Sequence, residues 1–253
     1  MEETAVINSV TDLLEQVKRL DLQADSFMFR GHSQWSWSLV PAIGRMYSSL
    51  IDYQDWNLFE TELIGEFRQY SRPFLTAEPR SWVEWLVVAQ HHGLPTRLLD
   101  WTTNPIKALF FAVDDPRHQS DGALWAFEPG LSFRGSPSST VAVPSGDMGW
   151  IESAESVEQL ESFFPDHLNP RVIAQESCFT LFPFPKTATP IPPLEERERR
   201  ADEISQLFKF RVPGNAKPLI SRELRQLGIT YRTLFPDLEG LATSIRREYN
   251  LSW

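Results

Sequence analysis

The sequence is poor in cysteine and in long apolar runs. Its 253 residues include one cysteine, Cys178, which excludes an internal disulfide and a zinc site built from thiolates. Cys178 lies within an apolar run, which indicates a packed thiol. Apolar runs such as residues 108–113 are far shorter than the roughly 20 residues that cross a bilayer, and no basic segment followed by an apolar one begins the chain. We therefore expect a cytoplasmic protein without a membrane partner.

Several catalytic signatures and a surplus of basic residues are also missing. The sequence has no Gly-rich phosphate loop, no Gly-x-Ser-x-Gly elbow and no Cys-His nucleophile pair, which excludes kinase-like enzymes, hydrolases of the elbow type and thiol proteases. The formal net charge of −10 argues against a general duplex-DNA binder, because such proteins need a basic surface to displace counterions. Residues 207–247 are richer in lysine and arginine than in acids. This segment is either a solvated helix surface or a local phosphate-binding face.

The pattern of apolar residues predicts an α+β fold. Hydrophobic residues make up 42% of the chain, enough for a sizeable core. Helical spacing and capping residues predict helices over residues 9–20, 52–71, 82–91, 104–112, 215–227 and 237–250. Strands are predicted near residues 27–29, 96–101, 122–128, 171–182 and 208–212. Because helices and strands do not alternate regularly, we expect a curved, mostly antiparallel sheet flanked by helices, with a C-terminal helical extension.

Prolines divide the sequence into three parts. We expect a core over residues 1–182, a stiff proline-rich linker over 183–193, and a C-terminal part over 194–253, beginning with a charged helix near residue 195, that packs on the core. A single domain over 1–253 is the alternative. Residues 129–150, with glycine, serine and proline throughout, predict a long surface loop, and such loops often serve as lids or binding loops.

The first candidate site is a dense polar cluster between two apolar segments. Its members fall within 15 residues of one another, where Gly93 and Pro95 end a helix and force an extended segment. Polar groups concentrated at such a break are typical of a binding site, although a buried network that ties helices to a strand is the alternative reading. The cluster consists of Gln90, His91, His92, Thr96, Arg97, Asp100, Thr102, Thr103 and Asn104.

The second candidate site lies at the end of an apolar strand, where Arg30 is followed by Gly31 and His32. A guanidinium presents a planar fork of donors that suits bidentate capture of a phosphate or carboxylate. The alternative is a structural salt bridge to a buried acid such as Asp100. Gly31 allows the chain to turn sharply, and His32 either contacts a ligand or is a structural hydrogen-bond partner.

Together the two sites reveal a family resemblance. The sequence resembles FRG-domain proteins in Phe29-Arg30-Gly31 and in the run from Gln90 to Trp101. Residues 170–180 and 227–242 also fit the family's pattern, so the resemblance extends over residues 25–245. The family is defined by its motifs, and these imply little about its activity.

The order of these features also resembles ADP-ribosyltransferases of the arginine-serine-glutamate class. Arg30-Gly31 is similar to the strand-end element that holds the nicotinamide dinucleotide, and Thr102-Thr103 to the Ser-Thr-Ser segment before a helix. Gln175-Glu176 is similar to the catalytic element, where the class has one residue between the two. On a strand, adjacent residues would point to opposite faces.

This second resemblance implies an ADP-ribosyltransferase-like fold and activity as a transferase or NAD glycohydrolase, with NAD as the substrate. The acceptor macromolecule and a toxin or phage-defence role stay open. The residues implied in catalysis are Arg30, Glu176 and Gln175. A carboxylate or amide there would stabilise the ribose 2′-hydroxyl as the bond to nicotinamide loosens. The residues implied in nucleotide binding are Arg30, Gly31, His32, Gln90, His91, Thr96, Arg97, Asp100, Thr102 and Thr103.

Two further hypotheses belong to other functional classes. The first is a metal-dependent hydrolase that groups His91, His92, His32 and Asp100. We expect no metal, because adjacent residues on a helix are about 100° apart and do not easily share one ion. The second is a non-catalytic module that binds a nucleotide, a nucleic-acid end or a partner peptide, since tryptophans near both motifs offer stacking faces.

The sequence makes one geometric prediction that the fold tests directly. We expect six side chains to line one pocket, because the two motifs are the places where polar groups interrupt apolar elements. They are Arg30, His32, Gln90, Arg97, Asp100 and Thr102.

Overall fold

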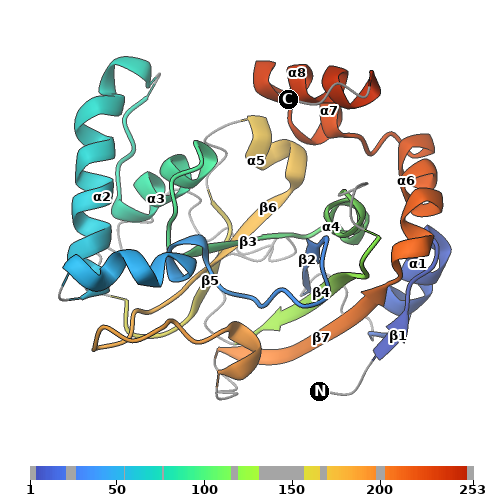
Figure 1. Cartoon of the computed structure of the whole chain (residues 1–253), viewed down its shortest axis with the longest axis horizontal. Coiled ribbons are helices and arrows are strands. Elements are labelled where there is room, and N and C mark those ends of the chain that lie inside the picture. Colours follow the sequence, from blue (N-terminus) through green and yellow to red (C-terminus); the bar gives the residue numbers. More distant parts are fainter. Residues whose placement is uncertain are drawn as a thin grey trace, which may run out of the picture.

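A single mixed sheet organises the molecule (Figure 1). The computed structural model describes residues 4–20, 27–53, 55–75, 77–114, 119–130, 157–165, 170–197 and 203–249. The seven strands have the order β1-β7-β4-β2-β3-β6-β5, and β1 and β7 form the parallel pair of an otherwise antiparallel sheet. The strands are β1 (Thr4–Val6), β2 (Met28–His32), β3 (Leu98–Thr102), β4 (Gly122–Pro129), β5 (Glu161–Phe163), β6 (Ser177–Leu181) and β7 (Ile204–Val212). The predicted α+β class and mostly antiparallel sheet are confirmed.

The helices begin at capping residues that the sequence supplies. Asp55, Ser81 and Asn104 each accept a hydrogen bond from a backbone N–H of the first helical turn, which satisfies a donor that has no partner within the helix. The α-helices are α1 (Val10–Arg19), α2 (Trp56–Ser71), α3 (Trp82–His91), α4 (Pro105–Val113), α5 (Pro170–Gln175), α6 (Lys217–Gln226), α7 (Tyr231–Leu234) and α8 (Leu238–Glu248). Short 3-10 helices cover Ala42–Asp52, Arg72–Phe74, Leu194–Glu196 and Gly214–Ala216. The expected C-terminal helices are therefore present.

Alternate residues of the central strands face two different cores. On β2, Phe29 packs in the cluster that includes α1, α4 and α6, whereas Met28 packs in the cluster on the opposite face with Leu99 and Trp125. This alternation is the period of a strand buried on both sides. Arg30 therefore shares the face of Met28, and Gly31 shares the face of Phe29.

Gly31 is required by the close crossing of α4 over β2. A Cβ atom built at Gly31 would overlap the carbonyl oxygen of Ala108 and approach the backbone nitrogen of Ala112 to 2.5 Å. Both atoms belong to the backbone of α4, so a side chain could not be accommodated by a rotamer change. Gly31 serves close packing, whereas the sequence suggested a sharp turn.

The strand predicted over residues 171–182 is half wrong. Residues Pro170–Gln175 form α5, and the strand β6 starts only at Ser177. Glu176 joins them with a φ of 49°, a left-handed conformation that non-glycine residues adopt infrequently. Gln175 and Glu176 are therefore not neighbours on a strand, and the expectation that they point to opposite faces of a sheet is wrong.

The C-terminal part of the chain contributes to the same sheet. β7 pairs with β4 from Gly122↔Val212 to Pro129↔Ile204. In the proline-rich segment, the Trp56 indole N–H donates to the Thr189 carbonyl oxygen at 2.8 Å, and Ile191 is buried. The charged helix expected near residue 195 appears as the 3-10 turn Leu194–Glu196, and residues 198–200 lie outside the described residues.

Two further sequence expectations concern a loop and the membrane. The loop predicted over residues 129–150 lies, from residue 131 onward, outside the described residues. Among the helices that the structure describes, none has the length and apolar character needed to cross a membrane.

Candidate functional site

The candidate site lies where β2 and β3 separate. Within their described lengths the two strands are paired at Phe29↔Thr102, and a cavity of about 280 Å³ occupies the space beside this pair. We call it the β2–β3 cavity. It is lined by Phe29, Arg30, Gly31, Val87, Gln90, His91, Asp100, Trp101, Thr102, Phe111, Arg171, Val172, Gln175, Ser177 and Phe179. Elements from both sequence motifs and from α5 and β6 thus meet around one space.

Arg30 bridges the gap between the two strands. Its Nη1 donates to the backbone carbonyl oxygen of Asp100 at 2.7 Å, so the guanidinium satisfies an acceptor that strand pairing leaves open. Its Nε donates to Nε2 of His32 at 3.0 Å. Burial lowers the pKa of Arg30, and the Asp100 carboxylate opposes this effect. Two hydrogen bonds therefore fix the orientation of the fork.

His32 acts as a neutral acceptor beneath Arg30. Burial and the positive charge of Arg30 lower the pKa of His32 to about 3, although a bond to the Trp37 carbonyl opposes the shift. Nδ1 lies 3.3 Å from the Trp37 carbonyl oxygen. Because Nε2 must accept from Arg30, the proton belongs on Nδ1, which donates to Trp37. His32 thus orients Arg30 without lining the β2–β3 cavity.

A second set of hydrogen bonds fixes Asp100. The Gln90 Nε2 donates to Asp100 Oδ1 at 2.6 Å. The Thr96 hydroxyl donates to Gln90 Oε1 and accepts from the Leu98 backbone N–H at 3.2 Å. The remaining oxygen, Oδ2, lies 3.6 Å from Arg30 Nη1, and the Asp100 side chain is 53% exposed. Arg30 and Asp100 thus form an ion pair, as the structural alternative expected, but the acid is exposed and not buried, so that alternative is met only in part.

The opposite wall of the cavity carries a second guanidinium. Arg171, on α5, lies over the Phe235 ring at 4.3 Å from its centroid. Burial lowers the pKa of His91, and the nearby Arg171 charge lowers it further. The Gln175 amide donates to the Leu234 carbonyl oxygen at 3.1 Å, which ties α5 to α7. The described lining therefore contains two arginines and one carboxylate.

The loop before α4 is bonded to the end of α5. The Thr102 hydroxyl donates to the Gln175 carbonyl oxygen at 2.7 Å, and accepts from the Asn104 backbone N–H at 3.1 Å. The Thr103 backbone N–H donates to the Glu176 carbonyl oxygen at 3.2 Å. Thr102 and Thr103 thus join the two segments through hydrogen bonds that stabilise the cavity floor.

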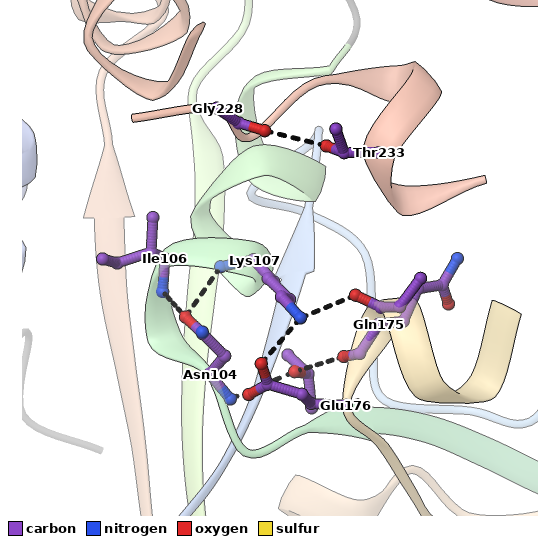
Figure 2. Close-up of polar contacts among 9 residues, drawn as sticks. Asn104, Ile106, Lys107, Gln175, Glu176, Gly228 and Thr233 are labelled. Atoms are coloured by element: carbon purple, nitrogen blue, oxygen red, sulfur yellow. Dashed lines mark hydrogen bonds and ion pairs between the residues drawn. The ribbon is translucent and has the colours of Figure 1, made fainter. Parts of the chain in front are cut away.

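Glu176 is bound to a lysine outside the cavity lining. Figure 2 shows Lys107 reaching from α4 toward Glu176, with the Nζ–Oε1 distance at 2.7 Å. The same Nζ donates to the Ala174 carbonyl oxygen at 2.6 Å. The Glu176 side chain is 46% exposed and that of Lys107 is 12% exposed. Glu176 is therefore engaged in a partly exposed ion pair.

Arg97 forms a separate, fully buried network. Its Nη2 lies 2.8 Å from Glu60 Oε2, and its Nε donates to Glu60 Oε1 at 3.0 Å. The guanidinium carbon lies 3.4 Å from the centroid of the Phe184 ring. Burial lowers the pKa of Arg97, whereas Glu60 raises it. Arg97 is thus part of the core and does not reach the β2–β3 cavity.

The structure brings together most of the predicted site residues. Those that line the cavity are Arg30, Gly31, Gln90, His91, Asp100, Thr102 and Gln175. Those outside its lining are His32, Thr96, Arg97, Thr103 and Glu176. The prediction of one shared pocket therefore holds for four of its six members (Arg30, Gln90, Asp100 and Thr102) and is wrong for His32 and Arg97. His32 is buried and bound to Arg30 and the Trp37 carbonyl, and Arg97 is paired with the buried Glu60.

No metal-binding group appears in the part of the chain that the structure describes, where histidine, cysteine and acidic side chains do not gather in threes. Both ring nitrogens of His32 face protein partners. The His91 and His92 rings meet edge to face at 4.9 Å between centroids. The metal-hydrolase hypothesis therefore gains nothing from this geometry.

The sequence did not indicate that Arg171, Phe111 and Phe179 line the cavity. Phe111 and Phe179 read as core residues in the sequence, and Arg171 lies in a segment that was predicted as a strand. The available signal was the resemblance of residues 170–180 to the FRG pattern, in which Arg171 is a charged residue beside an apolar run.

The comparisons with known proteins agree with part of the sequence reading. Residues 25–121 match the model of the FRG domain, and this range includes Arg30-Gly31 and the run from Gln90 to Trp101. No curated protein and no solved structure matches the chain. The FRG resemblance is thus confirmed over residues 25–121, and nothing in the comparisons supports the resemblance to ADP-ribosyltransferases.

Proposed function

We propose that this chain, which carries an FRG domain over residues 25–121, binds a phosphorylated organic ligand of about nucleotide size in the β2–β3 cavity. The observation that supports the proposal most strongly is the hydrogen bonding of the Arg30 guanidinium. Its Nε and Nη1 each donate to a protein acceptor, the described residues provide no hydrogen-bond acceptor for its Nη2, and the residue lines the cavity. A fork oriented in this way is suited to a phosphate or carboxylate.

The charges and walls of the cavity support the same ligand class. Arg30 and Arg171 outweigh Asp100 among the described lining residues, although the whole chain has a net charge of −10. The walls include Phe29, Trp101 and Phe111, which offer apolar surface to a planar ring. Such a combination is typical of sites that fix an anionic group and enclose an apolar body.

The size of the cavity favours one nucleotide unit over a buried dinucleotide. Its volume of about 280 Å³ is at the lower limit of the roughly 300–1,000 Å³ that ligand pockets span. In our proposal, a dinucleotide such as NAD would place one half in the cavity and the other outside it. NAD and its fragments are therefore the first ligands to test.

ADP-ribosyl transfer or NAD hydrolysis is the second candidate function. It is favoured by the hydrogen bonds that join Thr102 to Gln175 and Thr103 to Glu176, which bring two of the three elements of the transferase resemblance side by side next to Arg30. In hydrolysis, the bond between nicotinamide and ribose breaks, the water oxygen bonds to the ribose carbon, and nicotinamide, ADP-ribose and one proton are released. Glu176 would first have to release Lys107.

Calorimetry tests the two candidates with one set of ligands. We expect the wild-type chain to bind AMP, ADP-ribose or NAD, and an Arg30→Gln variant to bind each far more weakly. Arg72→Gln is the matched control, since Arg72 forms an exposed ion pair with Glu78. Release of free nicotinamide from NAD separates the transferase from the binding module. Absence of binding by the wild type at millimolar ligand overturns the proposal.

A further inference from the structure

Asp100 is the one carboxylate among the described residues that line the β2–β3 cavity. We infer that it accepts a hydrogen bond from a hydroxyl of the ligand, so that the site takes a ribose phosphate unit and disfavours a bare anion. This inference rests on the proposed function and names the substrate class of the same site. It is carried by the direction of the hydrogen bonds around Asp100 and by its distance from Arg30.

The hydrogen bonds around Asp100 give it the role of an acceptor. Leu98 N–H donates to the Thr96 oxygen, so the Thr96 hydroxyl hydrogen is free to donate to Gln90 Oε1. This fixes the orientation of the Gln90 amide, whose NH₂ group must then donate to Asp100 Oδ1. Asp100 therefore receives a hydrogen bond from Gln90 at Oδ1 and lies beside the Arg30 guanidinium, so both of these protein neighbours present donors to it.

Asp100 also keeps acceptor capacity for a ligand. Oδ2 lies 3.6 Å from Arg30 Nη1, which is an ion-pair contact longer than a normal hydrogen bond. The Nη1 atom instead donates to the Asp100 backbone carbonyl at 2.7 Å. With 53% of the side chain exposed, Oδ2 is open to a donor that enters the cavity. A ligand without such a donor would bring its anion next to an Asp100 oxygen that no ligand group binds, and the two negative charges would repel each other.

The spacing of the two groups selects a hydroxyl close to the phosphate. Because Arg30 Nη1 and Asp100 Oδ2 are 3.6 Å apart, one ligand engages both most directly when its anion and its donor lie close together in the ligand. The exocyclic amine of a nucleotide base is separated from the phosphate by the whole sugar. A ribose hydroxyl lies much nearer, so a hydroxylated phosphate fits the pair better than a base edge does.

The test compares AMP, 2′,3′-dideoxy-AMP and inorganic phosphate by calorimetry with the wild type and Asp100→Asn. We expect the wild type to bind AMP about tenfold or more tightly than the dideoxy analogue, because a hydrogen bond to a charged acceptor is lost. Asp100→Asn is expected to weaken AMP binding and to strengthen binding of the dideoxy analogue and of inorganic phosphate, since removing the carboxylate removes its repulsion of the anion. A merely structural role would weaken all three ligands together.

The controls keep the outcomes distinguishable. Glu78→Gln removes an exposed carboxylate of another ion pair and should change none of the three affinities. Should Asp100→Asn fail to fold, Asp100→Glu retains the charge and should retain the preference for AMP. Equal affinity of the wild type for AMP and the dideoxy analogue overturns the inference and leaves the proposed function standing. Absence of any nucleotide binding overturns the proposed function itself.

Discussion

Arg30 and Arg97 show how one residue type has two roles in the same molecule. Burial lowers the pKa of both, and each lies near a carboxylate. Arg97 pairs with Glu60, and both side chains are almost completely buried, whereas Asp100, the partner of Arg30, is 53% exposed. The exposure of the partner acid therefore distinguishes the cavity arginine from the core arginine better than burial of the arginine does.

The largest effect that this comparison predicts is on stability. We expect Arg97→Ala to lower the free energy of unfolding by about 3–5 kcal/mol, because it leaves the buried Glu60 carboxylate without its partner. Chemical denaturation measures this loss. Ligand affinity of the folded fraction should stay within about twofold of the wild type. A loss below about 1 kcal/mol would mean that Glu60 is hydrated, in conflict with its burial.

The second-largest effect that we predict is a loss of ligand affinity. We expect Arg30→Ala to weaken AMP binding by about 100-fold, since hydrogen bonds to charged groups contribute about 1.5–3 kcal/mol each. Arg30→Lys should be nearly as weak, because an ammonium does not reproduce the fork. Calorimetry and thermal melting together check the contrast with Arg97. Severe destabilisation by both Arg30 variants, with unchanged affinity, would reassign Arg30 to the core.

Only the Arg30 side of this contrast could be predicted from the sequence. Arg30, Gln90 and Asp100 were placed together because a strand end and a helix break are points where polar groups interrupt apolar elements. Arg97 was placed with them for the same reason, yet it belongs to the core. The sequence does not reveal that Glu60, from α2, lies over Arg97, since that contact joins residues far apart along the chain.

The end of α5 could not be predicted for a different physical reason. Val172 and Ile173 are β-branched and favour strands, so the run into Cys178 indicated one continuous strand. The break depends on Glu176 adopting a positive φ, a conformation rare for glutamate. With the chain broken at Glu176, Arg171 lies on α5 at the cavity, and the Glu176 side chain pairs with Lys107.

A third prediction concerns His32, whose ring nitrogen accepts from the Arg30 Nε, whereas the Arg97 Nε donates to the Glu60 carboxylate. Its pKa is about 3 in the fold and about 6.5 when unfolded, so the unfolded chain binds the proton first as the pH falls. The stability that neutral His32 contributes is thus complete above pH 6.5 and is lost progressively toward pH 3. Between pH 7 and pH 5 we expect this residue to cost about 2 kcal/mol of unfolding free energy.

The His32 prediction is checked by chemical denaturation at both pH values. His32→Gln keeps an acceptor for the Arg30 Nε and should remove about this much of the loss on acidification. His92→Gln is the control, because His92 is an exposed residue at the end of α3. An identical pH dependence in the wild type and His32→Gln would show that His32 is not the titrating group.

The smallest stability effect is expected at the Lys107–Glu176 pair, and it sharpens the distinction between binding and catalysis. Glu176→Gln should change the free energy of unfolding by less than about 1 kcal/mol, because the ion pair is partly exposed. AMP affinity should be unchanged, since Glu176 lies outside the cavity lining. If the transferase candidate is correct and the Glu176 carboxylate acts in catalysis, Glu176→Gln must abolish release of nicotinamide from NAD. If the Gln175 amide acts instead, Gln175→Ala must abolish it. Nicotinamide release that persists in both variants would remove both residues from catalysis, so that the oriented Arg30 fork would serve binding alone.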